Sequence, residues 1–141
     1  LGPYSRRAGG PAGPGGWWIL DEPEFHLAGD VVVPDLAGWR HERMPAIPNV
    51  AFFDVVPDWV CEVVLPATGR LDRMEKMPLY ARVGVGHLWL VNPLDRTLEI
   101  YRLSGSRWEV VETLGGAGIV RAEPFAAIGI DLGRWWIDPQ A

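Results

Sequence analysis

Proline and glycine recur so often along this chain that few stretches are left for a long helix. The sequence has 13 Pro and 17 Gly among 141 residues, and short runs rich in Val, Ile, Trp and Tyr lie between them. β-Branched and aromatic residues favour strands, whereas proline and glycine favour turns. The pattern therefore predicts many short strands joined by turns and argues against an all-helical bundle.

The length and composition fit one folded domain, since a single domain spans roughly 100–200 residues. Hydrophobic residues make up 48% of the chain and charged residues 22%, enough apolar material for a core and too little charge for a disordered chain. We expect a flexible N-terminal segment over residues 1–16, where the sequence is rich in Gly and Pro, and a single domain over residues 17–141.

The compartment is suggested by the single cysteine, Cys61, which cannot form an internal disulfide. The longest apolar runs fall far short of the ~18–20 residues that a membrane span needs, and nothing resembles a signal peptide. We therefore expect a soluble, cytoplasmic protein with no membrane partner.

The charge distribution limits the partners of the chain. Thirteen basic residues against 18 acidic ones give a net charge of −5, which argues against nonspecific coating of nucleic acid. All the basic residues but Lys76 are arginine, a bias that a GC-rich genome would produce by itself. Even so, an ammonium is a compact point charge that the planar guanidinium does not freely replace, so the place of Lys76 matters.

Two carboxylates fall within apolar, strand-like segments. Residues 31–40 have a strand pattern broken by Pro34, and residues 57–66, PDWVCEVVLP, predict a central strand. In the first segment, period-two alternation places on one face Val31, Val33, Asp35 and Ala37. In the second, alternation places Trp59, Cys61 and Val63 on one face, and on the other Asp58, Val60, Glu62 and Val64.

One helix is predicted over about residues 69–83, where Leu71, Met74 and the Leu79/Tyr80 pair repeat at helical spacing. Pro78 should kink its last turn, and Gly84 should end it. Three strands are expected over residues 87–93, 96–103 and 107–114, with shorter strands near 119–120 and 128–132. This order predicts an α+β fold with a mixed sheet, and it places Lys76 on the helix.

The residue types alone leave two interpretations open. Two carboxylates on neighbouring strands can bind a hard cation such as Mg²⁺, and a nearby ammonium could orient water or stabilise charge on a phosphate. Alternatively, Asp35 merely ends a strand, Glu62 faces solvent from an edge and Lys76 is an exposed helix residue. Before any resemblance is considered, the second interpretation is favoured.

The order of these segments closely resembles the Uma family of restriction-endonuclease-like proteins, part of the PD-(D/E)xK nuclease superfamily. The resemblance covers about residues 15–138, and its most specific parts are Pro34-Asp35, the PDWVCEV block and the passage YARVGVGHLWLVNP. It implies a restriction-endonuclease-like core, with a central mixed β-sheet and a flanking helix. It also implies a Mg²⁺- or Mn²⁺-dependent endonuclease that hydrolyses DNA with a metal-activated water.

The resemblance assigns roles residue by residue. Asp35 matches the motif aspartate and Glu62 the (D/E) position, so both would be metal ligands and, together with Lys76, catalytic residues. Where the superfamily pattern has lysine, this chain has Val64. In the Uma family a lysine on the next helix is thought to substitute, and Lys76 stands at that place.

Departures from the family pattern support a second hypothesis, a catalytically inactive nuclease-fold module for binding or assembly. Of the hydroxyl residues usual after the glutamate only Thr68 remains, and Asn92 stands where an aspartate is common. The net charge of −5 supports the same hypothesis.

Other groups are weaker candidates. Glu22 and Glu24 could add a third acidic ligand, although a solvated face is at least as plausible for them. The three histidines show no zinc-binding spacing, and Cys61 is predicted to be a small core residue. Contacts to phosphate are possible for Arg40, Arg43, Arg70, Arg73 and Arg82. A homodimer contact is suggested for Trp135 and Trp136.

Overall fold

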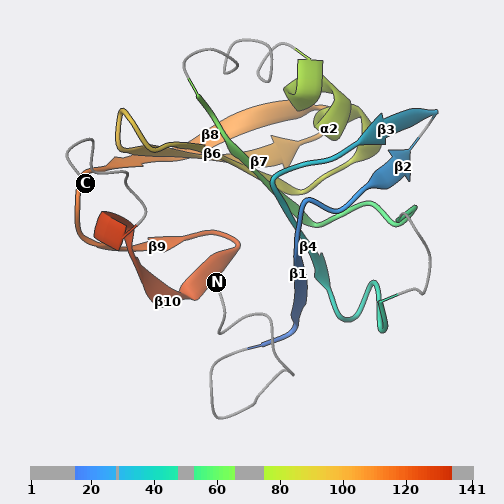
Figure 1. Cartoon of the computed structure of the whole chain (residues 1–141), viewed down its shortest axis with the longest axis horizontal. Coiled ribbons are helices and arrows are strands. Elements are labelled where there is room, and N and C mark those ends of the chain that lie inside the picture. Colours follow the sequence, from blue (N-terminus) through green and yellow to red (C-terminus); the bar gives the residue numbers. More distant parts are fainter. Residues whose placement is uncertain (1–14, 28, 48–52, 66–74, 135–141) are drawn as a thin grey trace.

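Strands make up most of the computed structural model, which describes residues 15–27, 29–47, 53–65 and 75–134 (Figure 1). Its elements in chain order are β1 (Trp17–Asp21), β2 (Phe25–Leu27), β3 (Asp30–Val32), β4 (Leu36–Arg40), β5 (Trp59–Val63), α2 (Met77–Val83), β6 (His87–Asn92), β7 (Thr97–Ser104), β8 (Arg107–Gly115), β9 (Ile119–Ala122), β10 (Phe125–Asp131) and the 3₁₀ turn η2 (Leu132–Arg134).

A six-stranded mixed sheet forms the centre, in the order β1-β4-β5-β6-β7-β8. The pair β5 and β6 is parallel, and the other neighbouring pairs in this sheet are antiparallel. Parallel neighbours need a crossover connection, and α2 lies in the chain between them. The predicted α+β class, with a mixed sheet and a flanking helix, is confirmed.

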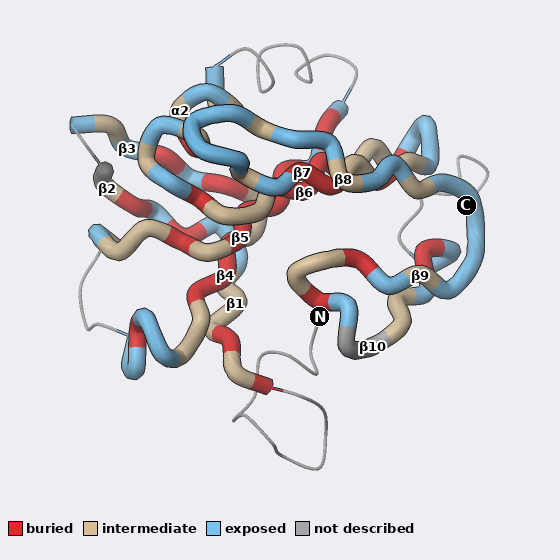
Figure 2. Tube along the Cα trace, turned by 180° about the vertical axis from the view of Figure 1, so that it is seen from behind, coloured by how far each residue is buried: buried red, intermediate tan, exposed pale blue. Residues whose placement is uncertain are grey.

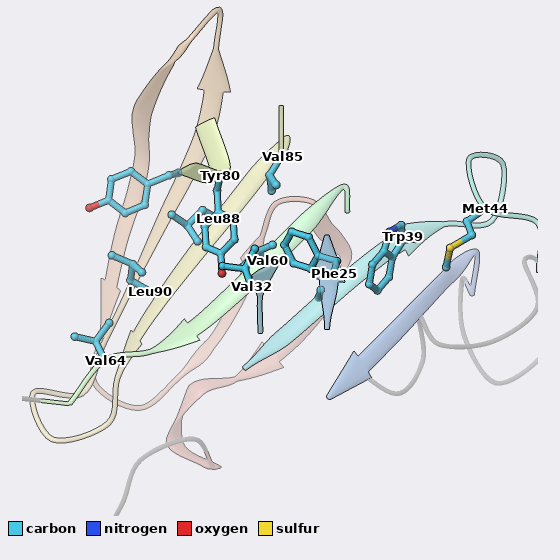
Figure 3. Close-up of a cluster of buried hydrophobic side chains, with 12 residues drawn as sticks. Phe25, Val32, Trp39, Met44, Val60, Val64, Tyr80, Val85, Leu88 and Leu90 are labelled. Atoms are coloured by element: carbon cyan, nitrogen blue, oxygen red, sulfur yellow. The ribbon is translucent and has the colours of Figure 1, made fainter. Parts of the chain in front are cut away.

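Period-two alternation divides the sheet into two apolar faces. On one face Val60 and Leu88 pack with Tyr80 of α2, and the β2–β3 hairpin adds Phe25 and Val32 to the same cluster. Figure 3 shows Tyr80 reaching from the helix toward the sheet, between Leu88 and Val60. The helix and this hairpin therefore cover one side of β5 and β6.

The opposite face is built on aromatic rings. Trp59 and Trp89 contact each other edge to face at 5.2 Å between ring centroids, and Phe125 of the β9–β10 hairpin lies 5.0 Å from Trp59. Cys61 belongs to this second cluster, as does Leu132. The C-terminal hairpin thus covers the side of the sheet that α2 leaves open, and Cys61 is the buried core residue that alternation predicts.

Gly38 of β4 lies close to two indole rings on this face, those of Trp17 and Trp59. A Cβ at this position would lie 3.1 Å from an atom of the Trp17 ring and 3.2 Å from an atom of the Trp59 ring. Both distances are shorter than ordinary van der Waals contact, so a side chain at this position would force the two indoles to shift by a few tenths of an ångström.

The predicted strand over residues 31–40 is interrupted, and the face assigned to it is wrong. Val31 belongs to β3, which pairs with β2 in a separate two-stranded sheet, whereas β4 starts at Leu36 in the central sheet. Val31 and Val33 are exposed, while Ala37 is fully buried. Alternation holds only within one continuous strand, and Pro34 ends that continuity, so Asp35 lies at the entrance to β4 instead of mid-strand.

The helix is confirmed over the described part of its predicted range; residues 66–74 lie outside the described residues. One wider turn at residues 75–76 precedes α2, and Pro78 lies in the first turn of the α-helix. A first-turn proline lacks only an N–H that needs no partner within α2. The kink at Pro78 stays a prediction, because the helix residues before 75 lie outside the described residues. Gly84 ends the helix with a φ of 92°, as a left-handed glycine C-cap does.

Burial is concentrated in the central strands (Figure 2). Strands β4 to β6 are mostly buried, whereas no residue of β8, at one edge of the sheet, is fully buried. Among the described residues, no helix is long and apolar enough to cross a membrane.

Candidate active site

Asp35 and Glu62 lie opposite each other where β4 begins and β5 ends. The antiparallel register pairs Leu36 with Cys61, so one further step along it brings Asp35 beside Glu62. Directly opposed residues on antiparallel strands point to the same face of a sheet. The backbone N–H of Val63 donates to Asp35 Oδ2 at 2.6 Å, which fixes the aspartate beside the end of β5.

Glu62 is a buried charged residue on an inner strand. Its exposed fraction is 2%, and β5 is flanked by β4 and β6, so the interpretation that Glu62 faces solvent from an edge is wrong. The hydroxyl of Tyr80 donates to Glu62 Oε1 at 2.6 Å. A buried carboxylate needs such partners, because burial removes the water that would otherwise stabilise its charge.

Lys76 reaches the same carboxylate from just before α2. Its Nζ lies 3.2 Å from Glu62 Oε2 and 3.4 Å from Oε1, and its side chain is 30% exposed. The interpretation of Lys76 as merely an exposed helix residue is therefore wrong. Val64, where the superfamily pattern has lysine, is buried in the cluster on the helix side of the sheet. The cation beside Glu62 thus comes from the helix segment instead of the strand.

The environment of Glu62 raises its pKa to about 7. Desolvation by burial is the largest cause, and the nearby Asp35 carboxylate also raises the pKa. The Tyr80 hydroxyl and the Lys76 ammonium lower it in part. A carboxylate in such surroundings is stabilised in its ionised form by additional positive charge.

The donor set fits a hard cation. Two carboxylates supply the oxygen ligands that Mg²⁺ prefers, and Mg²⁺ commonly uses only one or two carboxylates together with water and substrate phosphate. Within residues 15–27, 29–47, 53–65 and 75–134, no three His, Cys, Asp or Glu side chains gather into a possible metal site. Glu22 and Glu24 therefore do not add the third acidic ligand suggested for them, and Glu24 instead pairs with His26 at 3.4 Å.

Tyr80 is the site residue that sequence reasoning missed. The Leu79/Tyr80 pair marks the apolar face of the predicted helix, and Tyr80 is indeed fully buried, but its hydroxyl binds Glu62. A signal was present in the spacing, since Lys76 and Tyr80 are four residues apart and such residues share one helix face. Placing Lys76 toward the site therefore implies Tyr80 beside it.

The described arginines that were candidates for phosphate contacts are engaged within the protein. Arg43 binds Asp58 at 2.9 Å, and Arg82 binds Asp30 at 2.9 Å. The guanidinium of Arg40 lies over the ring of Trp17, 4.5 Å from its centroid. The proposed phosphate contacts of these three stay predictions, and Arg70, Arg73, Thr68, Trp135 and Trp136 lie outside the described residues.

Asn92 has a structural role at the end of β6. Its Oδ1 accepts the backbone N–H of Asp95 at 3.0 Å, and its Nδ2 donates to the Asp95 carboxylate at 3.1 Å. These bonds stabilise the turn between β6 and β7, which explains a side chain with both donor and acceptor atoms at this position.

Comparisons with known proteins agree with this architecture. The family model of Uma2, described as "Putative restriction endonuclease", matches residues 10–133. A crystal structure of a putative nuclease belonging to DUF820 from Anabaena variabilis is similar with a TM-score of 0.68 and 21% sequence identity, covering 86% of this chain and 70% of that one. At this identity the likeness shows the fold alone. No curated protein matches the chain.

Proposed function

Because this chain belongs to the Uma2 family of restriction-endonuclease-like proteins, we propose that it is a Mg²⁺-dependent endonuclease that hydrolyses DNA phosphodiester bonds. The observation that carries the proposal is the meeting of Asp35, Glu62 and Lys76 where β4 begins and β5 ends. A buried carboxylate, a second carboxylate and an ammonium there have the chemistry that hydrolysis of a phosphodiester requires.

Asp35 and Glu62 would hold the cation, Mg²⁺ or Mn²⁺. When bound, such a cation supplies Lewis acidity toward a phosphoryl oxygen and lowers the pKa of water. Hydrogen bonds orient both carboxylates for this role. The Val63 N–H holds Asp35 Oδ2, and the Tyr80 hydroxyl holds Glu62 Oε1.

Lys76 would act on the substrate phosphate. Its ammonium has three donors, and its side chain is 30% exposed although it contacts the buried Glu62. A partly exposed ammonium can therefore keep its contact with the carboxylate and donate to a phosphate oxygen on which negative charge develops.

The competing proposal is a catalytically inactive nuclease-fold module that binds or assembles. The observation that favours it is the pairing of Arg43 and Arg82 with carboxylates of the same protein, together with the net charge of −5. Paired arginines attract a phosphate backbone less than free ones do, so extended DNA contact has less support than the site itself.

We also propose a homodimer and a cytoplasmic location. Dimerisation rests on the adjacent Trp135 and Trp136, since paired aromatic residues are enriched at interfaces. The location rests on Cys61, whose thiol is buried and unpaired with another cysteine, as suits a reducing compartment.

The test combines metal titration with cleavage of plasmid DNA. Calorimetric binding of Mg²⁺ and Mn²⁺ should be present in the parent and lost in Glu62→Gln. Cleavage in Mg²⁺ should fall at least about 100-fold in Asp35→Asn and Glu62→Gln, because several kcal/mol of charge stabilisation are removed. Glu109→Gln, which removes a carboxylate charge at an exposed position of β8, is the matched control and should cleave DNA at the parental rate.

Two results would decide against the endonuclease. Parental cleavage rates in Asp35→Asn would show that the site is elsewhere. Metal binding with no cleavage of double-stranded or single-stranded DNA would favour the inactive binding module.

A further inference from the structure

Each carboxylate of the candidate site has one oxygen held by a short hydrogen bond from the protein. Asp35 Oδ2 accepts the Val63 N–H at 2.6 Å, and Glu62 Oε1 accepts the Tyr80 hydroxyl at 2.6 Å. Lys76 distinguishes the two Glu62 oxygens far less, since its Nζ lies 3.4 Å from Oε1 and 3.2 Å from Oε2. Among the described residues, no comparably short bond occupies Asp35 Oδ1 or Glu62 Oε2.

Tyr80 is held rigidly enough to keep this arrangement. Its side chain is fully buried in the helix-side cluster, where its ring centroid lies 6.2 Å from that of Phe25. The phenol therefore cannot turn to solvent and leave Oε1 without disturbing the packing. Lys76, by contrast, has a long flexible side chain that is 30% exposed.

We propose that Tyr80 is a positioning residue that restricts Glu62 to binding a cation through Oε2 alone, and that the site thereby prefers Mg²⁺ or Mn²⁺ to Ca²⁺. This inference rests on the proposed function, because it assigns a cation to the same pair of carboxylates.

The selectivity follows from how the cations use carboxylates. Ca²⁺ takes six to eight oxygen ligands and often binds both oxygens of one carboxylate. Mg²⁺ requires near-octahedral geometry, keeps several waters and needs only one or two carboxylates. With the Tyr80 hydroxyl on Oε1 and the Val63 N–H on Oδ2, a Ca²⁺ ion bound through both oxygens of either carboxylate would crowd against one of these donors, whereas a Mg²⁺ ion bound through one oxygen of each would not.

Calorimetric titration of Mg²⁺ and Ca²⁺ into the parent and Tyr80→Phe tests this. The substitution keeps the ring and removes the hydroxyl. Partners that orient a metal ligand are typically worth 10–100-fold in affinity, so the Kd for Mg²⁺ should rise about tenfold. The Kd for Ca²⁺ should stay unchanged or fall, because Oε1 becomes available to it.

Tyr101→Phe is the matched control. Tyr101 is also largely buried in the same apolar cluster and also donates its hydroxyl to a carboxylate, that of Glu99. It lies on β7 and takes no part in the candidate site. Both dissociation constants should therefore stay within about twofold of the parental values in this variant.

The outcomes separate this inference from the proposed function. A parent that binds neither Mg²⁺ nor Mn²⁺ and cleaves no DNA overturns the proposed function. A parent that binds Mg²⁺, with a Tyr80→Phe variant that keeps the parental ratio of the two dissociation constants, overturns only the role of Tyr80.

Infrared difference spectra of the parent cover the case in which Tyr80→Phe does not fold. A carboxylate bound through one oxygen shows a wider separation of its two stretching bands than a carboxylate bound through both. Mg²⁺-induced bands that disappear in Glu62→Gln should have the wide separation. A narrow separation would overturn the inference.

Discussion

Lys76 and Glu62 form an ion pair in which only one partner contacts solvent appreciably. The Glu62 side chain is 3% exposed, whereas the Lys76 side chain is 30% exposed. Removing either member therefore has an unequal effect. Loss of Lys76 leaves the buried Glu62 carboxylate with the Tyr80 hydroxyl but no cation, whereas loss of the Glu62 charge leaves an ammonium that water can solvate.

The free energy of unfolding of metal-free protein should depend on pH through Glu62. Its pKa is raised from 4.5 to about 7 in the folded protein, so between these values the folded state holds a proton that the unfolded chain releases. Stability from this group is therefore lost as pH rises through that window, by about 3 kcal/mol at most. Urea unfolding of the parent and Glu62→Gln in EDTA at pH 5 and pH 8 measures it. From pH 5 to pH 8 the free energy of unfolding should fall more in the parent than in Glu62→Gln. An equal change in the two proteins would contradict this.

Lys76→Met should destabilise the protein more at pH 8 than at pH 6. At pH 6 Glu62 can hold a proton and needs no cation, whereas at pH 8 it is ionised, and we expect a loss of about 1–3 kcal/mol. The same variant should lose DNA cleavage. Lys76→Arg is the informative comparison, because it keeps the charge and should restore stability but not the full cleavage rate. Equal unfolding curves at both pH values would argue against the ion pair.

Glu123 should hold the C-terminal hairpin on the sheet. Its carboxylate binds His87 of β6 at 2.8 Å and both Nε and Nη2 of Arg102 of β7, at 2.8 and 2.7 Å. The Arg102 hydrogen bond is the main cause that lowers the pKa of Glu123 to about 2. This contribution to stability is present above pH 4.5 and is lost as pH falls through about 2.

Glu123→Gln should therefore lower the free energy of unfolding at pH 7 by about 1 kcal/mol, with a smaller effect near pH 2. Hydrogen exchange should be faster in β9 and β10 than in β5 and β6 of this variant. Glu112→Gln, at an exposed position of β8 opposite Ile100, is the control and should leave both observations unchanged. Uniform exchange over all strands would show that the hairpin does not open on its own.

Gly38→Ala should cost about 1–3 kcal/mol, because the added methyl would lie 3.1 and 3.2 Å from two indole rings. Gly118→Ala provides the control, since a Cβ there meets nothing within 4 Å. We expect that control to stay within about 0.5 kcal/mol of the parent in urea unfolding. Similar losses at the two positions would mean that the ring packing tolerates a methyl.

Sequence reasoning succeeded where one strand runs unbroken. Over β5 and the residue that follows it, alternation correctly separates Glu62 and Val64 from Trp59 and Cys61, because all four lie on a single extended segment with one cover on each face. The helix end at Gly84 was also predictable, since a left-handed C-cap favours glycine wherever a helix stops.

Sequence reasoning failed where the answer depended on distant parts of the chain. Alternation predicts that Asp35 lies within one continuous strand. A period-two pattern does not reveal that the two-stranded sheet ends before Pro34 and that the central sheet begins after it. The repeat that contains Tyr80 predicts a helix and no role in the site, because a helical apolar stripe does not reveal which polar atom a ring hydroxyl will meet across the sheet. Both errors concern contacts between elements, for which local pattern carries little information.

The candidate site depends unequally on two parts of the chain. Glu62, Lys76 and Tyr80 all come from one strand–helix unit, whereas Asp35 enters only through the pairing of β4 with β5. A slip of a single residue in that pairing would turn every β4 side chain to the opposite face, so Asp35 would leave the site and the fully buried Ala37 and Trp39 would leave the helix-side cluster. The register that brings the second carboxylate to Glu62 is therefore the same register that packs the core, and a molecule that folds at all has both carboxylates together.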